Sequence, residues 1–492
     1  MKKTVKKVLT FTMVAATAMS MVACGGPQQG QEGSIHEPVY MVASLAGYKT
    51  EWLNAMAKKY KEETGSVVEI EWDASLMENL GNVFETEANM PDLYYANIGS
   101  PSAVFTWYVQ GKLETLNDVF AEQNGAGKTI EASLKAGRSQ SYILNGKRYA
   151  APLTDGNNIL VYNPDYLTAV GWDHFPITVD EFVEFAQDIK DAKIPTPDGK
   201  DTVQPLVWTG MYYSAKTLVD TFEAQYNGAT KMSEFYNQNG AEPDEDLYNM
   251  KGLEVACQNL AKMMAPKTVG IESFSDNSVD GSLGMSHTEA QAAFLNGYAA
   301  VCTTGTWFEN EMGENCNGKK YKIAPIPFAA DENGSYGAVV KKDPNGPDNP
   351  SNYKHVRAGN LNQDALLIPT KSQNKAGARA FIKFLLQEEN LKEMQRICGS
   401  PFAYEYDTSD LNLTGWNAEV AEYYNTTEYI TLGSSQPYAL FGVIGGYKID
   451  RLNKICTVPN YNYQKEIIDW RWTNVSKNWA DKASQLEGIE DF

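Results

Sequence analysis

The sequence has few of the residues on which metal and nucleophile chemistry depend. Its 492 residues include four histidines, and no two of them stand in the HExxH or HxxxH spacing of zinc-binding helices. No GxSxG nucleophile motif occurs, and no EF-hand calcium loop is present. The GKT at residues 127–129 lacks the first glycine of a phosphate-binding loop. The sequence therefore predicts no catalytic residues, no cofactor and no metal.

Cysteine is also scarce. Six occur, and no two of them form a CxxC pair. Cys24 has a separate role at the amino terminus, so an odd number remains, and a zinc ribbon or a disulfide scaffold is not expected. We expect mostly buried thiols with room for one bridge: Cys257, Cys302, Cys316, Cys398 and Cys456.

Positive charge is the third shortage. The chain has 42 Lys and Arg against 62 Asp and Glu, for a formal net charge of −20. This balance argues against a nucleic-acid partner and against electrostatic adhesion to anionic lipid, because both require basic patches. The length allows two or three domains, and 43% hydrophobic residues are typical of a globular protein.

Residues 1–24 have the features of a targeting segment. Four lysines precede an apolar run at residues 8–23, which ends in Met-Val-Ala-Cys. The ending resembles the bacterial lipobox, in which the cysteine, here Cys24, becomes the lipidated amino terminus after residues 1–23 are removed. An ordinary cleaved signal peptide is the alternative. Residues 24–35 form a polar, flexible tether, and no other segment is apolar and long enough to span a bilayer.

The order of strands and helices predicts an α/β fold. Residues 39–44 and 67–72 read as strands, and residues 50–64 between them read as a helix that Gly65 ends. This spacing is typical of a βαβ unit in a parallel sheet. Residues 178–189 begin with the capping box of Thr178 and Glu181 and continue as a helix.

Residues 290–312 combine a short helix, a buried strand, a turn and a new helix. Thr306 and Glu309 fit the capping box of the second helix, and Trp307 would lie in its first turn, just past the carboxyl end of the strand. Open α/β sheets bind ligands at such ends, where an indole offers a flat platform. A core position for Trp307 is the alternative.

The same stretch resembles the "aFxxGkaAMxxxGxW" segment of extracellular solute-binding proteins that serve sugar importers of the ATP-binding-cassette type. Two further segments, NGKRYAAPLTDGNNILVYNPDYL at residues 145–167 and the SPF at residues 400–402, resemble conserved segments of this maltose-binding-protein-like family. The resemblance implies two α/β lobes that close by a hinge over an interdomain cleft. It also implies that the tryptophan stacks on a sugar ring.

The resemblance further implies domain boundaries and site residues. The first lobe would comprise residues 36–152 and 362–400, and the second residues 153–361 and 401–492, with a mainly helical carboxyl-terminal part. After Trp307, the polar TDGNN segment would face the cleft, although Asp-Gly-Asn also suits a plain turn. Segment position adds weaker candidates, of which Trp208 and Tyr212 are equally consistent with core packing. The candidates beyond Trp307 are Asp155, Asn157, Asn158, Tyr48, Asn97, Trp208, Tyr212, Asn360 and Tyr404.

These features predict a binding protein rather than an enzyme. It would capture an oligosaccharide and deliver it to the permease subunits of the importer, as a monomer lipid-anchored on the extracellular face of a bacterial membrane. Two alternatives remain open. One is a surface carbohydrate-processing enzyme, and the other is the same scaffold for a peptide, a polyamine or a metal chelate.

Overall fold

The structure is a computed structural model. It describes residues 30–45, 47–76, 79, 90–97, 101–210, 214–239, 242–264, 277–360, 364–435, 444, 448–458 and 461–486. The predicted targeting segment with Cys24, and the candidate Tyr212, lie outside these residues. Within them, no helix has both the length and the apolar composition needed to cross a bilayer.

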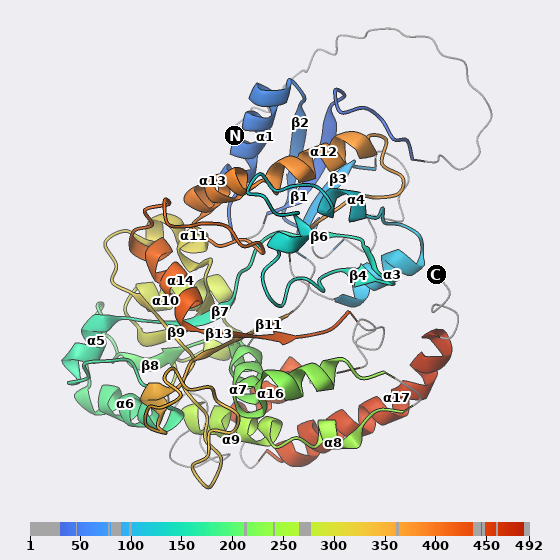
Figure 1. The fold of residues 1–492 in the computed structure, drawn as a ribbon. Helices are drawn as coiled ribbons and strands as arrows, with labels where there is room; N and C mark the ends of the chain where they lie inside the picture. Colours follow the sequence, from blue (N-terminus) through green and yellow to red (C-terminus); the bar gives the residue numbers. More distant parts are fainter. Residues whose placement is uncertain are drawn as a thin grey trace, which may run out of the picture.

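A five-stranded sheet organises what we call the first lobe, at the top of Figure 1. Its strand order is β2 (Val68–Asp73), β1 (Val39–Ser44), β3 (Leu93–Asn97), β12 (Asp364–Leu367) and β6 (Ala151–Pro152). β1 runs parallel to β2, and α1 (Glu51–Thr64) connects them, which confirms the predicted βαβ unit. Residues of α1, α12 (Lys375–Leu385) and α13 (Glu388–Cys398) share one buried core with this sheet.

A four-stranded sheet organises the second lobe. Its order is β10 (Lys322–Ala324), β7 (Asn158–Tyr162), β9 (Ala299–Gly305) and β8 (Gln204–Val207). All seven residues of β9 are buried, as predicted for a covered strand. One face of the sheet packs on α6 (Val179–Ala192) and α9 (Gly252–Met264). The other packs on α10 (His287–Leu295) and α14 (Gly415–Thr426).

Three segments that connect the two sheets are hydrogen-bonded side by side. The backbone N–H of Leu153 donates to the carbonyl of Asp364 at 2.9 Å, and the N–H of Asp155 donates to that of Pro401 at 3.0 Å. The N–H of Ala403 returns to the carbonyl of Leu153 at 2.9 Å. Short connections that lie side by side between two lobes are the places where hinge motion is usually absorbed.

The remaining elements extend or connect the lobes. β11 (Val356–Asn360) and β13 (Glu428–Leu432) form a parallel pair that packs on α7 (Ser214–Tyr236), between the two sheets in Figure 1. A π-helical segment, Gln464–Asp469, precedes the long carboxyl-terminal helix α17 (Trp470–Leu486). Shorter helices and strands are α3 (Pro101–Val109), α4 (Asn117–Phe120), β4 (Ile143–Leu144), β5 (Lys147–Arg148), α5 (Pro164–Ala169), α8 (Glu245–Tyr248), α11 (Phe308–Met312) and α16 (Ile449–Thr457).

Two stretches differ from what their sequence patterns indicate. Residues 222–246 show no clear helical periodicity, yet most of them lie in α7. The reason is Gly228, whose φ of 77° breaks the helix and rotates the buried face, so one helical repeat does not fit both halves. The apolar spacing of residues 376–397 predicts one helical segment, whereas the structure has two helices, α12 and α13, separated by Leu386 and Gln387.

One predicted capping box is confirmed and one is wrong. At α6, the Thr178 hydroxyl accepts from the N–H of Glu181, whose carboxylate accepts from the N–H of Thr178. At α11, the N-cap residue is Trp307 and makes no side-chain cap. Thr306 instead accepts from the N–H of Asn157 at 3.2 Å, because β7 lies beside it. The five described cysteines are buried free thiols without a bridge.

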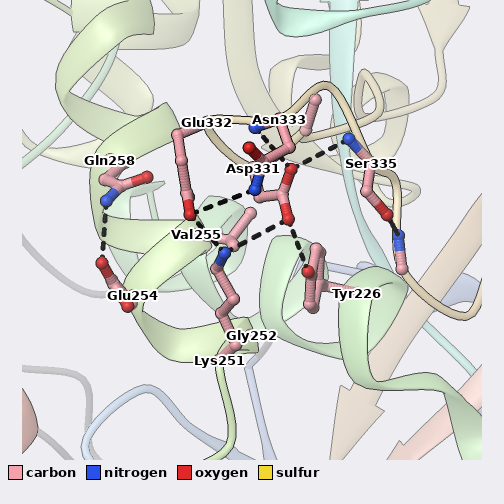
Figure 2. A network of polar contacts seen from close by, with 12 residues as sticks. Tyr226, Lys251, Gly252, Glu254, Val255, Gln258, Asp331, Glu332, Asn333 and Ser335 are labelled. Atoms are coloured by element: carbon pink, nitrogen blue, oxygen red, sulfur yellow. Dashed lines mark hydrogen bonds and ion pairs between the residues drawn. The ribbon is translucent and has the colours of Figure 1, made fainter.

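A carboxylate fastens the chain between β10 and β11 to the helices beneath it, as Figure 2 shows. Asp331 accepts from the backbone N–H groups of Asn333 and Ser335, each at 2.9 Å. It also accepts from the Tyr226 hydroxyl at 2.9 Å and from Lys251 Nζ at 3.2 Å. These bonds, that from Ser335 above all, lower the pKa of Asp331 to about 2. The network fixes the start of the segment that leads into β11.

Just before β11, His355 stacks on Phe328, with ring centroids 4.5 Å apart. Burial, with the charge of Lys342, lowers the pKa of His355 to about 4, whereas an unfolded histidine titrates near ~6.5. Between these values the unfolded chain binds a proton that the folded chain does not. The contribution of the buried, unprotonated His355 to stability is therefore complete above pH ~6.5 and decreases as the pH falls toward 4.

We expect His355→Phe to lose less stability than the wild type between pH 7 and pH 5, measured by urea denaturation at both values. His36 is exposed, so His36→Phe should retain the pH dependence of the wild type. Equal pH dependence in the wild type and in His355→Phe would contradict this prediction, because it would mean that His355 binds its proton equally well in the folded and the unfolded chain.

Candidate ligand-binding site

Trp307 lies between the two lobes. It follows the carboxyl end of β9 and is the N-cap of α11, so both elements that place it belong to the second lobe. Its half-buried indole packs against the core of the first lobe. There it meets Tyr48 edge to face, with ring centroids 6.3 Å apart and an interplanar angle of 70°. The indole is therefore not sealed inside one lobe.

Three glycines allow the close approach of this ring pair. A Cβ at position 305 would lie 2.3 Å from Cζ2 of Trp307, and one at position 47 would lie 2.8 Å from Cδ1. At position 156, a Cβ would lie 2.0 Å from the hydroxyl oxygen of Tyr48 and 3.0 Å from Cε3 of Trp307. Gly156 of the TDGNN segment is thus required by contacts between lobes, in addition to any turn that it forms.

Replacing Gly156 tests this contact. We expect Gly156→Ala to reduce the free energy of unfolding by about 1–3 kcal/mol, because the methyl group must displace Tyr48 or Trp307. Gly284→Ala is the matched control, since a Cβ there meets nothing within 4 Å. Urea denaturation of both variants measures the difference. Equal stability of the two variants would contradict the contact.

Near Tyr48, several polar side chains form hydrogen bonds to Asp364. Thr154 Oγ1 donates to Asp364 Oδ2 at 2.5 Å, and the Tyr95 hydroxyl donates to the same oxygen at 3.3 Å. Asn97, at the end of β3, also bonds to this carboxyl group. Asp364 Oδ1 is buried and has no hydrogen-bond partner among the described residues. Burial raises the pKa of Asp364, although the bonds from Thr154, Tyr95 and Asn97 act in the opposite direction.

Asp155 is surrounded by cations. Arg138 Nη2 lies 2.6 Å and Nε 3.1 Å from Asp155 Oδ1, and Lys135 Nζ lies 3.1 Å from Oδ2. Burial alone would raise the pKa of Asp155, but the charges of Lys135, Arg138 and Arg357 outweigh it and hold the pKa below its usual range. The carboxylate is 4% exposed, so these ion pairs are largely shielded from water.

The three candidate asparagines around this cluster differ in their bonds. Asn157 Nδ2 donates to the Tyr424 hydroxyl at 2.8 Å, while its buried Oδ1 has no donor among the described residues. Asn158 points away, since its Nδ2 donates to Thr217 on α7 at 2.6 Å. The exposed Asn360 uses its carbonyl, which accepts from Arg138 Nη1 at 2.5 Å.

Two further candidates lie in cores. Trp208 is 0% exposed in the core of the second lobe, and Tyr404 is 0% exposed in that of the first. Neither side chain offers a surface to a ligand in this structure. This placement favours the core packing that the sequence also allowed for Trp208.

The sequence alone did not predict the cations around Asp155 or the carboxyl group of Asp364 near it. Lys135 and Arg138 share one segment, whereas Arg357, Asp364 and Tyr424 come from three others, and none of the five belongs to a recognisable motif. Only tertiary structure brings them together. Asp364 begins β12, and only the antiparallel pairing of β12 with β3 places it opposite Asn97, at the carboxyl end of β3, where ligands bind in such sheets.

Comparison with known proteins then decides the family. The family model described as "Bacterial extracellular solute-binding protein" matches residues 46–392, which is more than half of the chain. This chain belongs to that family. Proteins of this family bind solutes and are not enzymes as a class, and the name of the family places them outside the cytoplasm.

Solved structures show that this solute-binding protein has the two-lobe α/β fold. The Thermus thermophilus maltotriose-binding protein bound with maltotriose superposes with a TM-score of 0.60 at 16% identity, over 90% of this chain and 100% of that one. The apo form of RafE from Streptococcus pneumoniae superposes with a TM-score of 0.57 at 16% identity, over 92% and 99%. The predicted fold class is confirmed.

A curated relative is similar over a shorter region. The diacetylchitobiose-binding protein DasA of Streptomyces coelicolor is 27% identical over 187 residues, which are 36% of this chain. The match spans 41% of DasA, less than half of its length.

Among the described residues, no three His, Cys, Asp or Glu side chains form a group that could hold a metal ion.

Proposed function

We propose that this solute-binding protein captures an extracellular oligosaccharide between its two lobes and delivers it to the permease of an ATP-binding-cassette importer. The observation that carries the proposal is the position of Trp307, at a strand end of one lobe and against Tyr48 and Gly47 of the other. An indole in this position can cover the apolar C–H face of a sugar ring.

A sugar site also needs polar atoms that can bond to hydroxyl groups, and buried ones occur in the segments that lead to the junction of the lobes. Sugar rims carry hydroxyl groups that both donate and accept hydrogen bonds. Asn157 Oδ1 and Asp364 Oδ1 are buried acceptors without donors among the described residues, and Ser44 and Ser400 have buried hydroxyl groups in the same state. Buried polar atoms normally have partners, so several without a partner at the junction of the lobes fit a hydroxylated ligand. Lobe closure would exclude water and strengthen these bonds.

The ligands of similar proteins support the same class of solute. Solved structures with this fold hold maltotriose, and RafE is in complex with raffinose. DasA binds diacetylchitobiose. Accordingly, Trp307, Tyr48, Asn97, Asp155, Asn157 and Asn360 form the site that we propose, with Asp364 and Arg357 added to the residues expected from the sequence.

The test is isothermal titration of the purified protein with a panel of oligosaccharides, peptides and polyamines. We expect saturable binding of at least one oligosaccharide, recovered chemically unchanged. Binding of a peptide or a polyamine alone would overturn the sugar assignment. Cleavage of the glycan during the incubation would instead establish the enzyme alternative.

Trp307→Ala makes the site testable. We expect this variant to bind its oligosaccharide about 1–3 kcal/mol more weakly, because a desolvated aromatic anchor is lost. Trp172→Ala provides a matched control, since Trp172 packs on the far side of the second lobe against α6. If Trp307→Ala binds every saccharide as the wild type does, the ligand lies elsewhere.

The cellular arrangement is proposed on the sequence. Cleavage before Cys24 and lipidation of that residue would anchor the protein on the extracellular face of the membrane, with residues 24–35 as the tether. The lobes would then comprise residues 36–152 with 362–400, and residues 153–361 with 401–492. Growth with labelled palmitate tests the anchor, and we expect Cys24→Ala to abolish incorporation of the label.

A further inference from the structure

Among the residues that the structure describes, the charged side chains where the lobes meet do not balance. Lys135 and Arg138 come from the first lobe, Asp155 from a connecting segment and Arg357 from β11 of the second lobe. We call these four residues the interlobe charge cluster. Three cations face one carboxylate in it, which leaves a surplus of two positive charges. A further carboxyl group, Asp364, interacts with Arg138 but has a pKa that burial raises, which works against a second negative charge.

Burial makes this surplus costly. Arg138 is 2% exposed and Arg357 is 9% exposed, so water screens neither guanidinium group well. A buried charge without an opposite charge is strongly unfavourable. The surplus is also local, because the chain as a whole has a formal net charge of −20. Concentrated positive charge at the meeting point of two lobes is consistent with a ligand that brings negative charge.

Arg357 shows where such a ligand would bind. Its Nε donates to Thr427 Oγ1 at 2.7 Å, and its guanidinium group lies over the Tyr424 ring, 4.0 Å from the centroid. These contacts hold the guanidinium plane in one orientation. Nη1, in contrast, is buried and finds no acceptor among the described residues. One edge of a fixed arginine fork is therefore available, which is the arrangement that binds anionic oxygens.

We propose that the bound oligosaccharide contains an acidic sugar residue, whose ring carries a carboxylate or a sulfate ester, and that Arg357 and Lys135 bind this anionic group. The inference rests on the proposed function, since it names the substrate class of the same site. Asp155 pairs with both Arg138 and Lys135, so one carboxylate is shared between two cations and Arg357 has no carboxylate of its own in the cluster. The Tyr424 ring beneath Arg357 and the acceptor of Asn157 complete the surroundings of the acidic residue.

The test compares charged and neutral forms of the same saccharides. The full-length mature protein is titrated calorimetrically with trimers of galacturonate, glucuronate and mannuronate, each beside its methyl ester, and with a sulfated and a neutral hexose trimer. We expect at least one acidic trimer to bind tenfold or more tightly than its neutral form. The uronate and sulfate arms decide which anionic group is recognised.

Variants test whether the interlobe charge cluster causes the tighter binding of acidic trimers. Arg357→Gln and Lys135→Gln should each weaken binding of the acidic trimer by about 10- to 100-fold, as expected for bonds between charged groups, and weaken binding of the neutral form by a clearly smaller factor. Arg396→Gln, which removes an exposed arginine paired with Glu393, is the control. The Lys135 side chain is 26% exposed, so Lys135→Gln keeps the test valid if Arg357→Gln does not fold.

The melting temperature of the free protein provides a second measure. Removing surplus positive charge should leave the melting temperature of Lys135→Gln equal to that of the wild type or higher, whereas a purely structural lysine would lower it. A neutral saccharide that binds as tightly as every acidic one would overturn the inference and leave the proposed function intact. Failure of all saccharides to bind would overturn the proposed function itself.

Discussion

Asp155→Asn is expected to lower the free energy of unfolding by about 3–5 kcal/mol, the usual result of removing one partner from a buried ion pair. Asp155 is the one carboxylate in the interlobe charge cluster, and Arg138 beside it is 2% exposed. An amide at this position keeps the shape of the side chain but leaves three cations facing one another. The energetic loss therefore exceeds that of a hydrogen bond.

Urea denaturation of the ligand-free protein measures this effect. Asp165→Asn is the matched control, because Asp165 pairs with Lys320 at the surface, where both side chains are more than half exposed. Exposed pairs contribute about 0–1 kcal/mol, so this variant should resemble the wild type. A similar small loss in both variants would mean that Asp155 is not needed to neutralise the cluster. High salt should partly rescue Asp155→Asn if anions can reach the cations.

Glu223→Gln is expected to have an effect of the same size, about 3–5 kcal/mol, at the opposite end of the second lobe. Arg471 of α17 lies 2.7 Å from Glu223 of α7, and the two side chains are 3% and 4% exposed. The guanidinium group also lies 4.3 Å from the centroid of Phe235. Without the carboxylate, the arginine stays charged and buried, and α17 loses this ion pair with α7.

The measurement is again urea denaturation, with Glu466→Gln as the control. Glu466 pairs with Arg451 at 3.8 Å and is 43% exposed, so its loss should change stability by at most about 1 kcal/mol. The double variant Glu223→Leu with Arg471→Met should recover much of the loss, because a well-packed apolar pair can replace a buried ion pair. No recovery would show that the arginine has a further structural role.

Local signals in the sequence predict most of the first lobe and the central strands of the second. The βαβ unit, the buried strand β9 and the capping box of α6 each depend on neighbouring residues alone, and all three are present. α7 was missed because a single glycine, Gly228, divides its periodic pattern. The capping box at Thr306 failed because β7, which is distant in sequence, takes the threonine hydroxyl.

Only those parts of the proposed site that lie within a single segment could be predicted from the sequence. Trp307 and the TDGNN segment are recognisable from the sequence, and the structure places them together through Gly156. The cations around Asp155 come from residues 135, 138 and 357, and no local pattern indicates that they meet. Trp208 and Tyr404 illustrate the opposite limit, since an aromatic residue at a strand end can equally fill a core.

The most direct test of the account is a crystal structure of this solute-binding protein with the saccharide that binds most tightly in the titrations. We expect one sugar ring to lie against the indole of Trp307, with both lobes in contact with the ligand and its anionic group within hydrogen-bonding distance of Arg357. A ligand held by one lobe alone, with Trp307 untouched, would contradict the account.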